Sequence, residues 1–214
     1  MFTTKNLTDA LRAIASALLV PDLVILLALI LVTVIMAGTL VAEAFTERRH
    51  MRAKLPELLN RLENPDQPLE DIIRESGLLK RQKKALLTVC AQKRLTPLKR
   101  ESLAGELISD EHAHYDLRTK ITDLVMKLGP MFGLLGTLIP LGPGIIALGR
   151  GDTYTLSTSL LTAFDTTIAG LIAAAAATVI SMIRKRWYAR YMGQLGSVTE
   201  CLLDAMEVQK DEKA

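Results

Sequence analysis

The chain has 214 residues, of which 50% are hydrophobic and 23% are charged, and its mean hydropathy is +0.27. Such a hydropathy beside so many charges excludes an ordinary soluble domain, because the apolar residues must be gathered into blocks. The formal net charge of +3 arises from basic clusters beside these blocks and does not indicate a nucleic-acid-binding protein.

The first apolar block follows a short leader. Apolar residues recur at helical spacing from Leu11 to Leu18, so residues 1–20 are predicted to form an amphipathic helix on the outer leaflet that stops at Pro21. Residues 21–44 are the first predicted span, since residues 23–42 carry no charge and about 20 helical residues cross a bilayer. A signal-peptide core is the alternative. Because the block is long and lacks a convincing small-residue cleavage site, we interpret it as a retained anchor.

A helical cytoplasmic region is predicted for residues 45–127. The first helix should continue to about residue 54 and break near Pro56, a short helix should run from Pro68 to Gly77, and another should cover residues 78–93. Thr96 is a predicted N-cap, with Pro97 at the first position of a long helix. The basic residues of the third segment are interpreted as a solvated face, with contact to anionic lipid as the alternative; they are Lys80, Arg81, Lys83 and Lys84.

The second predicted span, residues 128–149, contains two prolines. Pro140 and Pro143 have no N–H, so the carbonyls of Gly136 and Ile139 would lose their helical partners. Within a membrane, carbonyls without hydrogen-bond partners are tolerated only where they are packed in protein or line a water-filled cavity. We interpret the prolines as a helix kink that presents carbonyls beside Thr137, a candidate station for ions or water. A kink that serves only packing is the alternative.

An outer turn is predicted for residues 150–157 and the third span for residues 158–183. Asp165 is the only charge in this span, and an intramembrane carboxylate is a functional-site hypothesis by default. A structural hydrogen bond between helices is its alternative role. Hydroxyls surround it and are predicted to line an ion route; they are Thr162, Thr166 and Thr167.

The helical wheel of the third span has two arcs. The large apolar residues occupy one arc, which is predicted to face lipid: Leu160, Leu161, Phe164, Ile168, Leu171, Ile172, Val179 and Met182. Small and hydroxyl residues occupy the other: Thr155, Ser159, Thr162, Thr166, Ala169, Gly170, Ala173 and Ala177. Such a stripe either packs helices closely or offers hydroxyls to ions and water, and the sequence leaves both readings open.

The basic residues predict the orientation of the chain. Of the 26 Lys and Arg residues, 17 lie in residues 45–128 and six more in the C-terminal segment, residues 184–214. Both segments should therefore be cytoplasmic, with the N-terminus and the outer turn on the opposite side of the cytoplasmic membrane. In this compartment Cys90 and Cys201 should stay reduced.

No enzyme is predicted, because the sequence has no Ser/His/Asp set, no phosphate-binding glycine loop and no metal-ligand cluster. His112 and His114 alternate along a helix and therefore fall on different faces, so we interpret them as part of a solvated surface. No cofactor and no metal is expected.

Two runs resemble a known family. GPMFGLLGTLIPLGPGIIAL and LLTAFDTTIAGLIAAAAATVI are similar to the core of the MotA/TolQ/ExbB proton-channel family, and the predicted topology is that of its three-span ExbB/TolQ-like branch. Thr137 and Thr167 match the family's pore threonines of the second and third spans. The chain departs from the pattern at Thr162, where many members carry glutamate, and at Pro140, where glycine is usual.

The resemblance implies an all-α integral membrane protein with three transmembrane helices and long cytoplasmic helical extensions. It also implies a ring of identical subunits, usually a pentamer, around the spans of a one-span partner of the ExbD, TolR or MotB kind. Such a subunit forms the channel of a proton- or sodium-driven motor or energy-transducing complex, for example in protein transport. A non-conducting membrane scaffold of the same fold is the alternative function.

Overall fold

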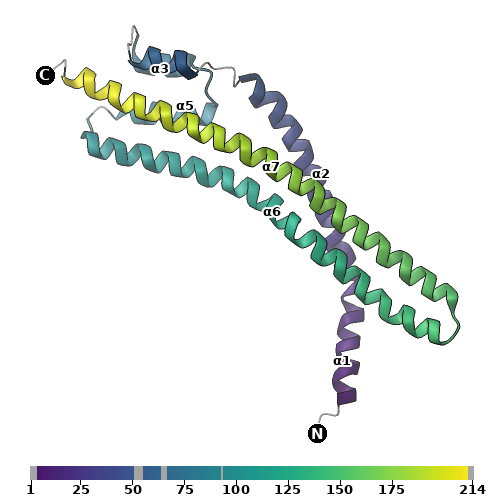
Figure 1. Ribbon diagram of the computed structural model, residues 1–214. Helices are drawn as coiled ribbons and strands as arrows, with labels where there is room; N and C mark the ends of the chain where they lie inside the picture. Colours follow the sequence, from purple (N-terminus) through teal and green to yellow (C-terminus); the bar gives the residue numbers. More distant parts are fainter. Residues whose placement is uncertain (1–3, 51–54, 64–66, 93, 212–214) are drawn as a thin grey trace. The chain divides into compact units, whose positions relative to one another are not determined.

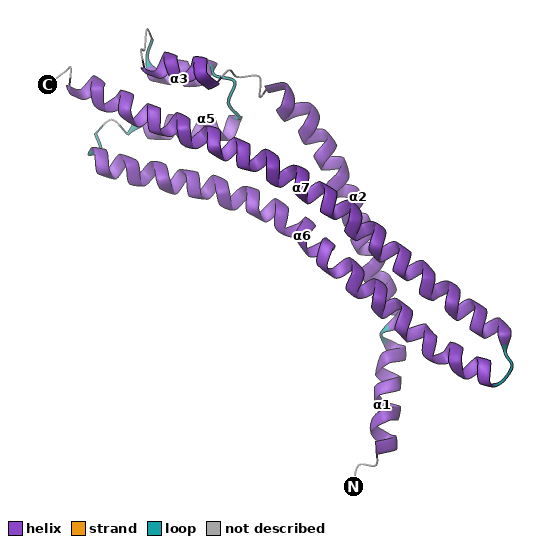
Figure 2. Ribbon diagram, viewed as in Figure 1, coloured by secondary structure: helices purple, strands orange, loops and turns teal. Residues whose placement is uncertain are grey.

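The computed structural model describes the chain except for residues 1–3, 51–54, 64–66, 93 and 212–214. The described residues form seven α-helices and no strand (Figures 1 and 2). In chain order these are α1 (Thr4–Ala17), α2 (Leu19–His50), α3 (Leu55–Glu63), α4 (Leu69–Glu75), α5 (Lys80–Ala91), α6 (Pro97–Gly149) and α7 (Thr153–Asp211).

One helix boundary near a proline differs from the sequence prediction. The break expected at Pro21 lies at Leu18, and Pro21 is in the first turn of α2. The break expected near Pro56 agrees with the structure, since α2 ends at His50 and a separate helix, α3, begins at Leu55; residues 51–54 lie outside the described residues. Both prolines occupy a first helical turn, where no backbone N–H has an intrahelical partner and the missing proton costs nothing.

Other boundaries agree with their sequence signals. Pro68 caps α4, whose first turn carries Glu70 and Asp71. The helix α6 begins at Pro97, directly after Thr96. It then continues without interruption through Pro130, Pro140 and Pro143.

The connection between α6 and α7 is shorter than predicted, because α7 already begins at Thr153. Gly151 has a φ of 75°, a left-handed conformation that glycine adopts without a Cβ penalty. Asp152 caps α7: its Oδ1 accepts the N–H of Thr155 at 3.0 Å and its Oδ2 accepts the Thr155 hydroxyl at 2.5 Å. These hydrogen bonds, that of the hydroxyl first, lower the pKa of Asp152.

The chain divides into two compact units. Unit 1 comprises Met1–Thr39 and Lys120–Met182, and unit 2 comprises Leu40–Thr119 and Ile183–Ala214. Three helical stretches are long and apolar enough to cross a membrane, namely Asn6–Phe45, Pro97–Gly149 and Thr153–Val208. Unit 1 contains most of the first and third predicted spans and the whole of the second. A small cluster of Leu29, Val125, Ala173 and Ala177 is buried in it.

Unit 2 has a larger core. Leucines of α3, α4 and α5 pack with the C-terminal part of α7, including Leu195, Val198 and Leu202, which are fully buried. Three tyrosine rings lie together in this core, with the Tyr115 and Tyr188 centroids 4.4 Å apart and those of Tyr188 and Tyr191 6.2 Å apart. Unit 2 is therefore organised like the interior of a soluble helical domain.

Candidate functional site

Glycines of α6 set the spacing of α6 and α7 in unit 1. A Cβ added to Gly129 would lie 2.6 Å from the carbonyl oxygen of Gly170, and one added to Gly133 would lie 3.3 Å from that of Thr166. Further along, a Cβ on Gly144 would lie 3.1 Å from Cβ of Ser159. The two helices thus run antiparallel in close backbone contact, as small residues permit in membranes.

The contact between α6 and α7 shows which arc of the third span is buried. The small-residue arc of α7 packs within unit 1: Thr166, Gly170, Ala173 and Ala177 are buried. The residues of the apolar arc are exposed on the single chain, apart from the first of them, Leu160, which is half-buried. Close helix packing, one of the two readings of the small-residue stripe, is therefore its role over these four residues.

The four candidate threonines bond to backbone carbonyls. Thr166 is 4% exposed and its hydroxyl donates to the carbonyls of Ala163 at 2.9 Å and Thr162 at 3.0 Å. The hydroxyl of half-buried Thr167 donates to Ala163 at 3.1 Å, with a second carbonyl, that of Gly133 on α6, at 3.5 Å. Thr167 thus joins the third span to the second.

The other two threonines bond within their own helices. The Thr137 hydroxyl donates to the carbonyl of Leu134 at 2.6 Å, and that of Thr162 donates to the carbonyl of Thr158 at 3.0 Å. Both side chains are half-buried on the single chain. The hydroxyl oxygens keep free lone pairs, which can accept a proton donor or ligate a cation.

Asp165 is exposed on the single chain. Its neighbours on this face are also exposed and apolar, among them Phe164 at 62% and Ile168 at 55%. The structure therefore separates Asp165 from Thr166, which is the next residue but is buried against α6.

Pro140 is buried and Pro143 is exposed, within an uninterrupted helix. Because Pro140 has no N–H, the carbonyl of Gly136 lacks the usual donor four residues on. Gly136 lies against α7, where a Cβ would be 2.7 Å from Cβ and 2.8 Å from Oγ1 of Thr166. Because Gly136 has no side chain, its backbone thus lies close to the buried side chain of Thr166.

Asp22 is a candidate that the sequence analysis did not include. This carboxyl group lies in the first turn of α2 and is 2% exposed, and neither oxygen has a hydrogen-bond partner among the described residues. Its Oδ2 is 2.7 Å from the position of a Cβ on Gly136. Asp22 directly precedes the uncharged block at the start of the first predicted span, where a charge is ordinary, so hydropathy alone did not single it out. Its position beside an apolar block was the only available signal.

A second missed cluster lies in unit 2 and is centred on Glu43. The Glu43 carboxylate accepts hydrogen bonds from Arg118 at 2.6 Å, from Nε of Arg184 at 3.3 Å and from the Tyr188 hydroxyl at 3.3 Å. The Arg184 side chain is only 2% exposed. Burial, and after it the negative charge of Glu43, raises the pKa of Tyr188. A buried arginine needs such a partner, so this cluster is structural.

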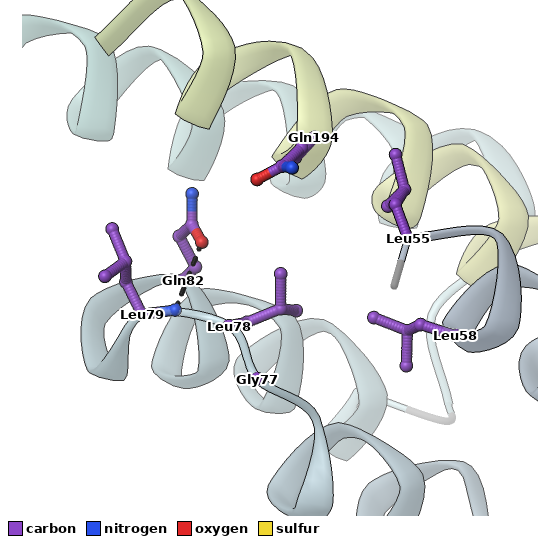
Figure 3. A pocket seen from close by; sticks show the side chains of 7 residues that line it. All are labelled: Leu55, Leu58, Gly77, Leu78, Leu79, Gln82 and Gln194. Atoms are coloured by element: carbon purple, nitrogen blue, oxygen red, sulfur yellow. Dashed lines mark hydrogen bonds between the residues drawn. The ribbon is translucent and has the colours of Figure 1, made fainter. Parts of the chain in front are cut away.

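Unit 2 also contains a small pocket (Figure 3). Its lining residues are Leu55, Leu58, Gly77, Leu78, Leu79, Gln82 and Gln194. The Gln82 amide donates to the carbonyl of Tyr191 at 3.0 Å and its oxygen accepts the N–H of Leu79 at 3.3 Å. Since the lining has no ionisable side chain, this pocket offers no acid–base or metal chemistry.

The histidines and cysteines lie apart from the membrane threonines in sequence and belong to unit 2. His112 is exposed and His114 is half-buried, and the described residues contain no group of three or more side chains that could hold a metal ion. Cys90 is buried, and the Cys201 thiol lies 3.6 Å from the carbonyl of Leu59.

Comparison with known proteins gives one finding. The model of the MotA/TolQ/ExbB proton channel family matches residues 68–197, which include α4, α5, the whole of α6 and most of α7. No curated protein matches the sequence. The matched region contains Thr137, Thr162, Asp165, Thr166 and Thr167, whereas Asp22 and Glu43 precede it.

Proposed function

The chain belongs to the MotA/TolQ/ExbB proton channel family, and we therefore propose that it is the channel-forming subunit of an ion-driven energy-transducing complex. It is a multi-pass membrane protein of a family of channels rather than of enzymes. In our proposal, identical subunits form a ring, five by analogy with the family, around the spans of a one-span partner. Proton flow along the ring and the partner then drives the complex.

The observation that carries the proposal is the exposed carboxylate of Asp165. It lies in the third span among exposed apolar side chains. A carboxylate facing lipid at the bilayer centre costs about 2.5–3.5 kcal/mol on the lenient insertion scale. A neighbouring subunit, a partner helix or an aqueous route would remove this cost. The half-buried Thr137 and Thr162 favour the same arrangement, because their hydroxyl lone pairs are available on the surface of the single chain.

The proposed orientation follows from the basic residues beside the spans. Arg184, Lys185 and Arg186 follow the third span directly, and Trp187 and Tyr188 come next. Basic residues mark the cytoplasmic side, and aromatic residues anchor at the interface. We place unit 2 in the cytoplasm and the N-terminus outside.

Reconstitution of the full chain with its one-span partner in liposomes tests the proposal. We expect proton flux down an imposed gradient, and we expect Thr137→Val and Thr167→Val to reduce this flux while the ring keeps its mass in native mass measurements. The matched control is Leu161→Val on the exposed apolar face, which should leave flux unchanged. Flux no greater than that of empty liposomes, from an intact complex, would refute conduction.

A non-conducting scaffold is the second candidate function. It is favoured by the threonine hydroxyls, all four of which already donate to backbone carbonyls. Threonine hydroxyls bonded in this way can stabilise helix packing without contacting an ion. An intact ring that binds its partner but passes no ions would identify the scaffold.

A further inference from the structure

The surroundings of Asp22 contain a hydrogen-bond acceptor and no donor that reaches it. The Thr166 hydroxyl gives its proton to the carbonyls of Thr162 and Ala163, so it offers only lone pairs to other groups. No described residue donates a hydrogen bond to either oxygen of Asp22. An ionised carboxylate is itself only an acceptor, whereas a protonated carboxyl group has an O–H to donate. This surrounding therefore suits the protonated form.

No charged group compensates for an ionised Asp22 in the part of the chain that the structure describes. Of the basic residues in unit 1, Lys120, Lys127 and Arg150 are exposed. The other acidic residues have their own surroundings: Asp165 is exposed, Asp152 bonds to Thr155, and Asp123 accepts the Ser181 hydroxyl at 2.6 Å. On α1, Asp9 and Arg12 are exposed. A buried carboxylate with neither a cation nor a donor costs several kcal/mol, and a proton removes that cost.

We propose that Asp22 is a proton-binding site of the ion route, held between α2, α6 and α7 beside Gly136 and Thr166. This inference rests on the proposed channel function. One proton adds to a carboxylate oxygen of Asp22 from water on one side of the membrane and is later lost to water or to a partner's carboxylate on the other. An O–H bond forms and then breaks, and no electron is transferred.

A proton fits this site better than a metal cation. A desolvated cation needs several oxygens to replace its hydration shell. The oxygen that the structure places beside Asp22 is the hydroxyl of Thr166, and neither oxygen of Asp22 has a hydrogen-bond partner among the described residues. Asp22 is almost fully enclosed by its own chain, so the site exists in each subunit.

Gly136 is part of the site because it leaves room for the carboxyl group. A methyl group at this position would come within 2.7 Å of both Asp22 Oδ2 and Thr166 Cβ. Gly142, on the same helix, has nothing within 4 Å of the position of its Cβ. The two glycines therefore form a matched pair for substitution.

The first experiment is infrared spectroscopy of the full chain in lipid vesicles at neutral pH. We expect a C=O stretch of a protonated carboxylic acid that shifts in heavy water and is lost in Asp22→Asn. Asp152→Asn, which changes an exposed aspartate in the outer turn, should leave this band unchanged. A wild-type protein without the band, or an Asp22→Asn protein that retains all of it, would overturn the proposal.

The second experiment measures flux in the reconstituted complex. Asp22→Asn should lose proton flux while keeping the mass of the ring. Gly136→Ala should shift the carboxyl band and reduce flux, and Gly142→Ala should do neither. Undiminished proton flux in Asp22→Asn would overturn the proposal, as would a wild-type flux that follows a sodium gradient at constant pH and is lost in Asp22→Asn.

The two proposals fail in different ways. If the wild-type complex passes no ions but the band is present and depends on Asp22, the channel function is refuted and Asp22 stands as a proton-binding group. If the wild-type complex conducts protons and Asp22→Asn conducts equally well, the channel function stands and the role of Asp22 in the route is refuted.

Discussion

Glu43 joins three helices that are far apart in sequence. It belongs to α2, Arg118 to α6, and Arg184 and Tyr188 to α7, and all four residues are in unit 2. The Arg184 guanidinium is almost fully buried, so removing its anionic neighbour leaves a positive charge with poor compensation.

We expect Glu43→Gln to lower the free energy of unfolding by about 3 kcal/mol or more, the usual cost of breaking a buried ion pair. Denaturant titration of the protein in mild detergent measures this loss. The control is Glu75→Gln, which breaks the exposed pair of Glu75 with Arg61 at 2.9 Å and should cost less than about 1 kcal/mol. Equal losses in the two variants would contradict the structural role of the cluster.

His114 gives a pH dependence to unit 2. Burial, and after it the charges of Arg81 and Arg118, lower the pKa of His114 from 6.5. The unfolded chain therefore binds the proton more readily, and the stability contributed by the neutral imidazole is complete above pH 6.5 and is lost as the pH falls below it.

The melting temperature of the wild-type protein should accordingly fall between about pH 7.5 and about pH 5.5, and it should fall less in His114→Gln. His112→Gln is the control, because that side chain is exposed and its variant should follow the wild type. An identical pH profile for all three proteins would show that His114 has no such effect.

The polar residues of the candidate sites differ in how far the sequence alone could predict them. Asp165 and the threonines were found because a polar residue inside an apolar run is conspicuous in any single segment. Asp22 and Glu43 lie at the two ends of the first apolar run, where charge is ordinary. Their burial depends on Gly136, Thr166 and Arg184, which come from other helices, so no local pattern contains it.

At the scale of helices, the close approach of α6 and α7 depends on glycine. Gly129→Ala would place a methyl group 2.6 Å from the backbone carbonyl oxygen of Gly170, and a backbone atom cannot move aside cheaply. We expect a loss of about 1–3 kcal/mol in stability, typical of overpacking. Gly142→Ala, with open space around it, should be neutral. Equal stability of both variants would contradict the observed contact.

Helix boundaries were predicted best where one residue determines them. The helix α6 begins at Pro97, as the Thr96–Pro97 pair predicted, and the fixed φ of proline suits this first helical position. Pro21 was misjudged, because proline in a first turn begins a helix as readily as it follows one. The wheel of α7 gave the exposed and buried arcs, but it left open whether the buried arc meets its own chain or another, since periodicity defines a face and not its partner.

At the scale of the whole molecule, the exposed carboxylate of Asp165 in the third span would carry a free-energy cost if it faced lipid. If neighbouring subunits of a ring cover Asp165, the Asp165→Asn variant should still assemble into the ring. If the carboxylate of Asp165 also takes part in ion transfer, this variant should lose ion flux. The measurement pairs native mass with flux in liposomes, and Thr178→Val, at a half-buried threonine whose hydroxyl donates to Ala174 in its own helix, is the control. Full flux in Asp165→Asn would leave this residue with a structural role only.

Unit 2 is built from two separate segments of the chain, and this determines when it can fold during synthesis. It combines Leu40–Thr119 with Ile183–Ala214, so the third span must be made and inserted before Leu195, Val198 and Leu202 reach the core. Until then the leucines of α3, α4 and α5 pack only with one another and with the start of α6, and the side of the core that α7 covers is open. A ribosome-bound or truncated chain that ends before Ile183 therefore exposes apolar surface of unit 2, and such surface makes an incompletely folded chain prone to aggregation.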